Sequence, residues 1–441
     1  MSDLLAARSQ MAMSLAFHII FAVMGIGMPL LMVLAEHRWL RTHDPVWLDL
    51  AKRWSKGTAI LFAVGAVSGT VLSFELGLLW PGFMEYAGAI IGMPFSLEGF
   101  AFFIEAIFLG VYLYGWTRLS PRAHWWSGVA VAVSGVVSGI FVVFANAWMN
   151  APTGFRLVDG KPVDIDPIAA MLNPASFPQA LHMTIAAFAT TGIAVAGLHA
   201  WMLRRDKHSA FHRAAMHLGL LVAVPACLLQ LVSGDISAKF VAEWQPAKLA
   251  AMEGHFVTGK RAPLRIGGLP DEATRTTPYS IEIPAALSFL AFADFDAEVK
   301  GLDAFPESDW PPVAITHVAF QIMVGLGSAM AFACAWVVLL WIRKREVADS
   351  RLLLGLLALL TPAGFIAVEA GWVVTEVGRQ PWIVQGIMRT ADAVTPMPGL
   401  VVPLVTFTLL YLFLGVIVVW LLWAQIWRTA PDTSLRIRRD V

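Results

Sequence analysis

The feature that most constrains this chain is a series of long apolar runs separated by polar connections. Nine runs approach or exceed the roughly 20 residues that an α-helix needs to cross a bilayer. Charged residues make up only 14% of the sequence and hydrophobic residues 58%, which excludes an ordinary soluble globule. The sequence therefore predicts an all-α polytopic membrane protein, a single membrane domain over residues 1–441 with about nine transmembrane helices in bundles. The predicted spans are 11–34, 57–75, 96–116, 126–148, 179–203, 215–234, 313–342, 353–375 and 400–427.

Lysine and arginine are concentrated in alternate connections, and positive residues stay on the cytoplasmic side of a membrane. We therefore expect the amino terminus outside and the carboxyl terminus in the cytoplasm. The first run lacks a basic leader and a cleavage site, so we expect it to be retained as a span. The formal net charge is +0, and nothing indicates a nucleic-acid partner. The basic connections contain Arg38, Arg41, Lys52, Arg53 and Lys56; Arg118 and Arg122; Arg204, Arg205, Lys207 and Arg213; Arg343, Lys344, Arg345 and Arg351; and Arg428, Arg436, Arg438 and Arg439.

One long polar segment, residues 238–312, separates the sixth and seventh predicted spans and should lie outside. Its stretch "EWQPAKLAAMEGHF" has the pattern of an amphipathic helix, whereas "APLRIGGLPDEATRTT" has the composition of turns and loops. Loops longer than about 15 residues are usually functional or disordered. We therefore expect this outer loop to carry function.

Ionisable side chains inside the predicted spans are few, and each costs at least a few kcal/mol in lipid, so each indicates a function by default. All except Glu369 fall in the outer halves of their helices and can share one layer. The residues are His18, Glu98, Glu105, His182, His317, Glu369 and Glu376.

The histidines of this layer, with Met323 in a facing helix, suit axial ligation of haem iron. For each residue alone, a satisfied polar histidine or a packing methionine is the competing interpretation. Cys227 and Cys334 lie inside predicted spans without a CxxC or CxxCH pattern. A disulfide framework and covalently attached haem are therefore not expected.

Glu98 and Glu105 are seven residues apart, which places both carboxylates within about 20° on one helix face and roughly 10 Å apart. No basic partner lies nearby in sequence. This favours a proton relay over a pair of carboxylates satisfied by other helices.

The eighth span ends in "TEVGRQPW", which puts Glu376 and Arg379 together at a membrane boundary. With "GWVVTEV" before it, "GRQPW" resembles the signature of subunit I of the cytochrome bd-type quinol oxidases. Other motifs resemble those of this family in the same order: "LEGFAFFIEAIFLG", "ANAWMNAPTGF", "QALHMTIAAF", "GDISAKFVAEWQPAKLAAMEG" and "QIMVGLG". The compact outer loop is similar to that of the short-loop branch, which includes the cyanide-insensitive oxidases.

The resemblance implies an electrogenic quinol:O2 oxidoreductase, a haem-containing terminal oxidase of the bacterial cytoplasmic (inner) membrane. Ubiquinol or menaquinol would be oxidised at the outer face and O2 reduced to water with cytoplasmic protons, which generates proton motive force. The implied cofactors are a low-spin haem b of the b558 type, a high-spin haem b of the b595 type, and haem d or a further haem b at the O2 site. The implied partners are a subunit II, a small single-helix accessory subunit and membrane lipid.

For haem binding, the resemblance implies that His182 and Met323 ligate the low-spin iron. It implies that His18 and Glu376 ligate the two high-spin irons, without deciding which serves which. Arg379 matches the signature arginine and would pair with Glu376 or with a haem propionate.

For the reaction, the resemblance implies that Glu98 lies beside the O2-reducing centre and Glu105 on a proton path towards it. Lys248 and Glu253 match loop residues tied to quinol oxidation. Gln321 stands where many family members have arginine, so this chain lacks a positive charge that would favour the reduced low-spin haem.

Other classes fit less well. His317 is a fallback haem ligand, although it lies on a different helix face from Met323. A haem-copper oxidase needs adjacent histidines, and a bc-type cytochrome b needs two helices that each carry two histidines; neither pattern is present. A non-oxidase membrane haem protein or a proton-conducting transporter is the remaining alternative.

Overall fold

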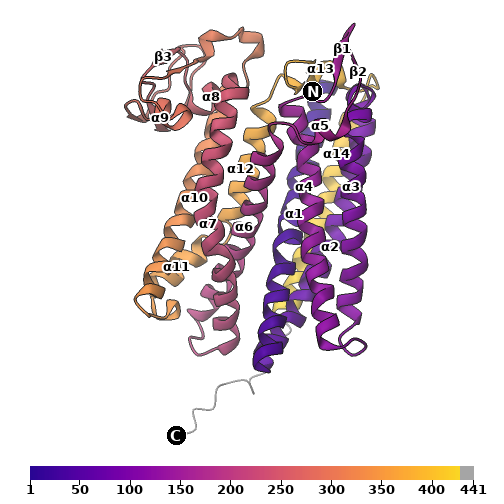
Figure 1. The fold of residues 1–441 in the computed structure, drawn as a ribbon, viewed down its shortest axis with the longest axis vertical. Helices are drawn as coiled ribbons and strands as arrows, with labels where there is room; N and C mark the ends of the chain where they lie inside the picture. Colours follow the sequence, from indigo (N-terminus) through magenta and orange to yellow (C-terminus); the bar gives the residue numbers. More distant parts are fainter. Residues whose placement is uncertain (428–441) are drawn as a thin grey trace.

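The fold, taken from a computed structural model that describes residues 1–427, consists mainly of long helices (Figure 1). Within these residues, nine helical segments are long and apolar enough to cross a membrane, which confirms the predicted number of spans. Four of the arginines used to predict the orientation, residues 428, 436, 438 and 439, lie outside the described part. The spans are α1 (Asp3–Thr42), α2 (Pro45–Leu79), α3 (Pro81–Tyr114), α4 (Pro121–Asn150), α6 (Ser176–Leu203), α7 (Ala210–Trp244), α10 (Val313–Ile342), α11 (Arg351–Leu359) with α12 (Ala363–Val377), and α14 (Val401–Trp427).

The helices form two groups that lie side by side (Figure 1). In the first group, α1 packs against α2, α4 and α14, and α3 packs against α4. In the second group, α6 and α7 pack against each other, and α10 contacts both α7 and α12. Helices α1 and α4 contact α6, so the two groups meet along these three helices.

The outer loop lies at the same end of the molecule as the amino terminus (Figure 1). Its helical stretch is confirmed as α8, but β4 and its partner β5 form an antiparallel pair in a region predicted as turn and loop. Helix α7 also continues past residue 238 to Trp244, and it ends just before Pro246, which has no backbone N–H to donate. The loop contains α8 (Pro246–Glu253), β3 (Gly259–Lys260), β4 (Leu264–Gly267), β5 (Ser280–Ile283), α9 (Ala286–Phe292), β6 (Glu298–Val299) and two 3₁₀ turns (Leu302–Ala304 and Glu307–Asp309).

Short elements cover the same end of the first helix group (Figure 1). Strands β1 and β2 form one hairpin, and β7 and β8 form another directly after the "GRQPW" motif. These elements are β1 (Arg156–Val158), β2 (Lys161–Val163), α5 (Pro167–Met171), β7 (Trp382–Val384), β8 (Met388–Arg389) and α13 (Thr390–Ala393).

The eighth span is broken, whereas the sequence predicts one continuous helix. The break between α11 and α12 falls at residues 360–362, because Pro362 has no backbone N–H to donate. The Thr361 hydroxyl donates to the Ala358 carbonyl at 2.8 Å and so satisfies one of the freed acceptors. Gly197 of α6 approaches this break so closely that a Cβ there would lie 2.4 Å from the Leu357 oxygen.

Glycines also set the separation of α6 and α7, the closest helix pair of the second group. A Cβ on Gly192 would lie 2.7 Å from the Ala223 nitrogen, and one on Gly219 would lie 2.8 Å from the Ala196 nitrogen. Small residues let membrane helices approach in this way, and close packing is a main source of their association.

We expect Gly192→Ala to lower the free energy of unfolding by about 1–3 kcal/mol, because its methyl group would overlap the α7 backbone. Gly88→Ala in α3 is the matched control, since nothing lies within 4 Å of a Cβ there. The control should be neutral, or stabilising by up to about 1 kcal/mol through helix propensity. Thermal unfolding of the purified protein in detergent measures both variants, and equal transition temperatures would contradict the close approach.

Candidate functional site

The centre of the candidate site is Glu376, in the last turn of α12 at the loop-bearing end. Its Oε1 accepts a hydrogen bond from Asn146 Nδ2 of α4 at 2.5 Å, and its Oε2 accepts one from Arg379 Nη2 at 2.6 Å. The Arg379 side chain is only 2% exposed, and its Nε and Nη1 have no hydrogen-bond partner among residues 1–427. Glu376 keeps 28% of its side chain exposed. A buried guanidinium with unpaired donors beside an accessible carboxylate leaves a place for an anionic group.

Lys248 of α8 is connected to this centre by hydrogen bonds. Its Nζ donates to Asn150 Oδ1 at 2.9 Å, and Asn150 Nδ2 donates to Asn146 Oδ1 at 3.1 Å. Burial and, to a smaller extent, the Arg379 charge lower the pKa of Lys248 to about 7, while the Glu376 charge opposes the shift. The outer loop is thus joined to the end of α12 by the chain Lys248–Asn150–Asn146–Glu376.

Glu253 lies at the other end of α8 and has different neighbours. Burial raises the pKa of its carboxyl to about 7, although the backbone N–H and the charge of Arg265 act in the opposite direction. Its Oε2 has no hydrogen-bond partner in the part of the chain that the structure describes. The structure therefore does not bring Lys248 and Glu253 together: the first faces α4 and α12, and the second faces the strands of the loop.

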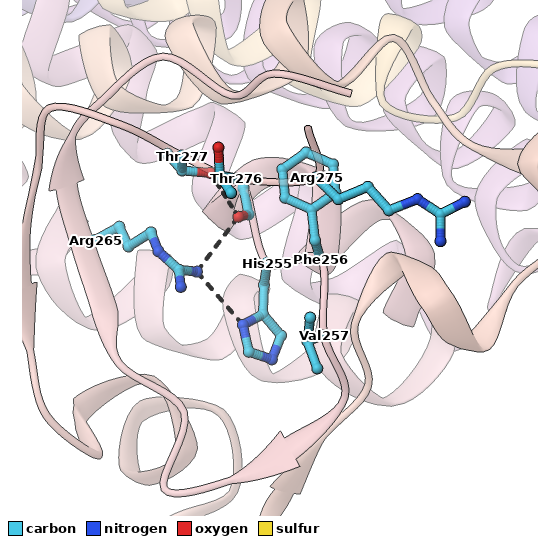
Figure 2. A pocket seen from close by; sticks show the side chains of 8 residues that line it. His255, Phe256, Val257, Arg265, Arg275, Thr276 and Thr277 are labelled. Atoms are coloured by element: carbon cyan, nitrogen blue, oxygen red, sulfur yellow. Dashed lines mark hydrogen bonds between the residues drawn. The ribbon is translucent and has the colours of Figure 1, made fainter. Parts of the chain in front are cut away.

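A small pocket of about 90 Å³ lies directly after Glu253 (Figure 2). The guanidinium of Arg265 donates to the Gly254 carbonyl at 3.3 Å and points to His255 Nδ1 at 3.4 Å. The Thr277 hydroxyl donates to the same carbonyl at 2.8 Å. These bonds hold the chain rigidly where α8 ends.

Two side chains of α10 fasten the loop to the bundle. His317 is fully buried, with Nδ1 2.8 Å from the Met252 oxygen and Nε2 3.0 Å from the Gly267 oxygen. Gln321 donates to the Arg265 carbonyl at 3.0 Å and accepts from the Gly267 N–H at 2.9 Å. His317 therefore has no free ring nitrogen for iron, which removes it as a fallback ligand. Gln321 anchors β4.

His18 of α1 is held in one tautomer by α2. Its Nδ1 lies 2.9 Å from Ser68 Oγ, and this hydroxyl donates its own proton to the Val64 carbonyl at 2.9 Å. With the hydroxyl proton on this carbonyl, Ser68 accepts from the N–H at Nδ1, and the lone pair of Nε2 is then free. Histidines that ligate metals are usually oriented by such a second hydrogen bond. Gly69 gives the ring its room, since a Cβ there would lie 3.0 Å from His18 Cε1.

His182 of α6 has a similar arrangement with α7. Its Nδ1 lies 3.1 Å from Ser233 Oγ, whose hydroxyl donates to the Gln230 carbonyl. The Gln230 amide lies 3.1 Å from Nε2, so it would turn away when iron takes this position. Met323 of α10 packs against α12 where Gly371 leaves space, since a Cβ there would lie 3.1 Å from the sulfur.

Glu98 and Glu105 both face α4, as their seven-residue spacing predicts. The Ser138 hydroxyl donates to Glu98 Oε1 at 3.3 Å. Glu105 is 6% exposed, and its Oε1 lies 3.2 Å from the place of a Cβ on Gly135. Gly135 therefore makes room for the carboxylate, and Ser138 lies one turn of α4 further towards Glu98.

The residues fit haem better than a bare metal ion. Within residues 1–427, no group of three or more His, Cys, Asp and Glu side chains could hold a metal ion. His18, His182, Met323 and Glu376 each offer a single protein ligand, the pattern expected when a porphyrin supplies the other donors. The unpaired donors of Arg379 suit the propionates at the edge of such a macrocycle.

Sequence reasoning missed several polar residues of these sites. Asn146 and Asn150 lie four residues apart at the end of the fourth span, a signal that could have been used. Glu75 ends the second predicted span and is 2% exposed; its Oε1 accepts from Gln10 and Ser14, each at 2.9 Å. The serines beside the two histidines gave no signal, because serine is common in membrane helices.

Comparisons with known proteins identify the family and the fold of the chain. Residues 6–430 match the family model of cytochrome bd terminal oxidase subunit I. A Bacillus subtilis (strain 168) protein assigned as a cytochrome bd menaquinol oxidase subunit I is 39% identical, covering 96% of this chain and 96% of its own length. The cytochrome bd ubiquinol oxidase subunit 1 of the same organism is 33% identical, covering 98% of this chain and 96% of its own length. The solved structure of the bd oxidase from Geobacillus thermodenitrificans matches with a TM-score of 0.91 and 39% identity, covering 97% of this chain and 99% of that chain. The chain therefore belongs to the cytochrome bd terminal oxidase subunit I family.

Proposed function

We propose that this oxidase subunit oxidises quinol at the loop-bearing face of the bacterial cytoplasmic membrane and passes the electrons to O2, with protons drawn from the opposite, basic face. The observation that carries the proposal is the hydrogen-bonded chain from Lys248 to Glu376, which joins the loop to a candidate haem ligand. Relatives named as menaquinol and ubiquinol oxidases leave both quinols as substrates. Subunit II is the expected partner within the complex.

We assign His182 and Met323 to a low-spin haem b, and His18 and Glu376 to two high-spin haems. When bound, the haems carry electrons singly and bind O2 at one high-spin iron, whether that macrocycle is haem d or haem b. His18 contributes a lone pair in a fixed direction, because Ser68 holds the other ring nitrogen. Arg379 contributes buried N–H donors to the propionates.

Oxidation of quinol releases protons, and the loop contains a suitable acceptor. A general base works best when its pKa lies near the working pH, and burial brings the pKa of Glu253 to about 7. Lys248, with a pKa of about 7, changes charge in response to Glu376 and Arg379. The two residues thus act at opposite ends of α8: Glu253 accepts the quinol proton, and Lys248 interacts with the haem layer.

Reduction of O2 consumes protons, which Glu105 and Glu98 supply in this proposal. The two carboxylates lie roughly 10 Å apart along α3, too far for direct transfer. Ser138 hydrogen-bonds to Glu98 and is the third polar group on the way. Ordered water would complete the path.

Ser68→Ala should weaken binding of the haem that His18 ligates by about 10- to 100-fold, the usual effect of losing an orienting partner of a metal ligand. Ser73→Ala on the same helix is the control, because its exposed hydroxyl bonds only to the Gly69 carbonyl. Haem content per protein and the high-spin absorption bands are the measurements. Full haem content with an unshifted spectrum would reject the role of Ser68.

Glu253→Gln should lower quinol oxidation and flatten its pH profile. In the parent protein the carboxyl is ionised above its raised pKa of about 7, so the rate should increase as the pH rises through that value. Glutamine accepts no proton at any pH, so this limb should disappear while haem content stays intact. Glu298→Gln, on the exposed strand β6, should keep the parent profile. A Glu253→Gln variant with the parent pH profile would exclude Glu253 as the acceptor.

Glu105→Gln keeps the shape of the side chain but cannot ionise, so O2 uptake should fall about 100-fold or more while quinol still reduces the low-spin haem. Glu98→Gln should in addition perturb or deplete a high-spin haem. Steady-state O2 uptake compared with haem spectra distinguishes the two variants. Near-normal uptake by Glu105→Gln would mean that protons reach the O2 site by another route, such as subunit II.

A further inference from the structure

A buried polar cluster lies at the end of the first helix group opposite the loop. Glu36 of α1 and His124 of α4 form a pair, with Glu36 Oε1 2.7 Å from His124 Nδ1. The other ring nitrogen lies 2.9 Å from the Tyr112 carbonyl of α3, and the two rings are 4.4 Å apart. Glu36 and Tyr112 are 0% exposed and His124 is 2% exposed. The cluster thus joins three helices at the basic face.

Tyr112 continues the helix face that carries the proposed proton path. Residues 98, 105 and 112 of α3 are spaced by seven, so their side chains lie on one face in steps of roughly 10 Å. Tyr112 is therefore the next polar side chain after Glu105 on this helix face. It lies closer to the basic face of the membrane, from which the protons would come.

The facing surface of α4 is shaped to receive these side chains. A Cβ on Gly128 would lie 2.7 Å from the Tyr112 ring, and one on Gly135 would lie 3.2 Å from Glu105 Oε1. Three residues beyond Gly135, Ser138 hydrogen-bonds to Glu98. On α4, Gly128 thus faces Tyr112, and Gly135 faces Glu105. Ser138 follows and faces Glu98. The α3–α4 contact thus carries three polar side chains in a row from the cluster to Glu98, in steps of roughly 10 Å that water would have to bridge.

Two polar atoms of the cluster face each other without a well-formed hydrogen bond. Glu36 Oε2 and the Tyr112 hydroxyl lie close enough to interact, but neither makes a hydrogen bond of ordinary geometry within the described residues. Leaving such groups unpaired costs about 1–3 kcal/mol each, so buried polar groups of this kind normally bind water. A water between Glu36 and the phenol would be the first step of a chain towards Glu105.

One aromatic layer separates the cluster from the basic face. The Trp116 ring lies 3.9 Å from the His124 ring at a tilt of 38°, and Lys52 Nζ of α2 lies 5.4 Å from the centre of the Trp116 ring. Lys52 is exposed and is the charged group that approaches from α2. On α1, His37 packs against Trp125 instead. A rotation of Trp116 would open the pair to solvent.

We propose that Glu36, His124 and Tyr112 form the proton-uptake station that supplies Glu105 from the basic face of the membrane. The pair of Glu36 and His124 takes a proton from solvent, passes one through water at the Tyr112 hydroxyl to Glu105, and returns to its starting protonation. No electron moves and no bond other than to hydrogen changes. The inference rests on the proposed role of Glu105 in proton supply. A purely structural carboxylate–imidazole tie between α1 and α4 is the competing explanation.

Glu36→Gln in the complete oxidase tests the station, because glutamine retains a hydrogen bond to His124 but cannot exchange a proton. Steady-state O2 uptake should fall 10-fold or more, while haem content, haem spectra and anaerobic reduction of the haems by quinol stay unchanged. Asp49→Asn is the matched control: Asp49 pairs with Arg53 at 2.8 Å at the same end of α2, outside the cluster. O2 uptake by Glu36→Gln equal to that of Asp49→Asn, with intact haem spectra, would overturn the proposal.

Tyr112→Phe is the second variant, since it keeps the ring that packs on Gly128 and removes only the hydroxyl. After the reduced enzyme is mixed with O2, a pH-indicating dye should report slower proton uptake and a larger solvent deuterium isotope effect in this variant. If the cluster only held α1 and α4 together, neither the rate of proton uptake nor the isotope effect would change. If Glu36→Gln fails to assemble with haem, this measurement decides alone, and normal proton uptake in Tyr112→Phe overturns the proposal.

The double variant Glu36→Gln/Glu105→Gln separates this inference from the proposed function. On a single path, the double variant should be no slower than Glu105→Gln. Normal O2 uptake by Glu105→Gln would reject the proton path itself. Slow uptake by Glu105→Gln together with normal proton uptake in both station variants would reject only the station. A double variant whose rate loss is the product of the two single losses would also reject it, because two independent routes would then be at work.

Discussion

The organisation of this protein depends on one constraint: the hydrocarbon of a bilayer offers no hydrogen-bond partner. Polar side chains on the spans must therefore be satisfied by other helices, by water or by a cofactor. Glu75 Oε1 accepts from Gln10 and Ser14 across α1 and α2, and Glu36 Oε1 pairs with His124. Within the described residues, the second oxygen of each carboxylate and two nitrogens of Arg379 have no hydrogen-bond partner. Such unpaired atoms mark the places where water or a cofactor would complete the contacts between helices.

Glycines determine how closely the helices carry these groups to one another. The carboxylate of Glu105 and the ring of Tyr112 each occupy space that a side chain on Gly135 or Gly128 would fill. His18 is in the same situation with Gly69. Because any added side chain at these positions would displace a functional group, the backbone spacing and the chemistry of the sites are specified together.

The sequence predicts the features that local patterns encode. Hydropathy identifies the nine spans, since apolar length is a property of each segment alone. Helical periodicity predicts that Glu98 and Glu105 share a face, and both do face α4. Pro362 marks the break in the eighth span but does not prove it, because proline also occurs inside α1 and α3. The sequence could not provide the pairings between residues that lie far apart along the chain. Examples are Ser68 with His18, Asn146 with Glu376, and Gln321 of α10 with the Gly267 N–H of the loop. These depend on how the bundles pack.

Helix α8 shows how these pairings give the loop two roles. Lys248 and Glu253 are five residues apart, so their side chains leave the helix in directions about 140° apart. Burial brings the pKa of each to about 7 from opposite sides, which places both groups where a small electrostatic change alters their charge. The charges of Glu376 and Arg379 affect the pKa of Lys248, whereas the charge of Arg265 affects the pKa of Glu253. Because α8 is short and the residues from Lys248 to Glu253 are buried, one small packed helix holds both groups. In the proposed function, the loop would therefore take part in the redox chemistry as well as cover the site.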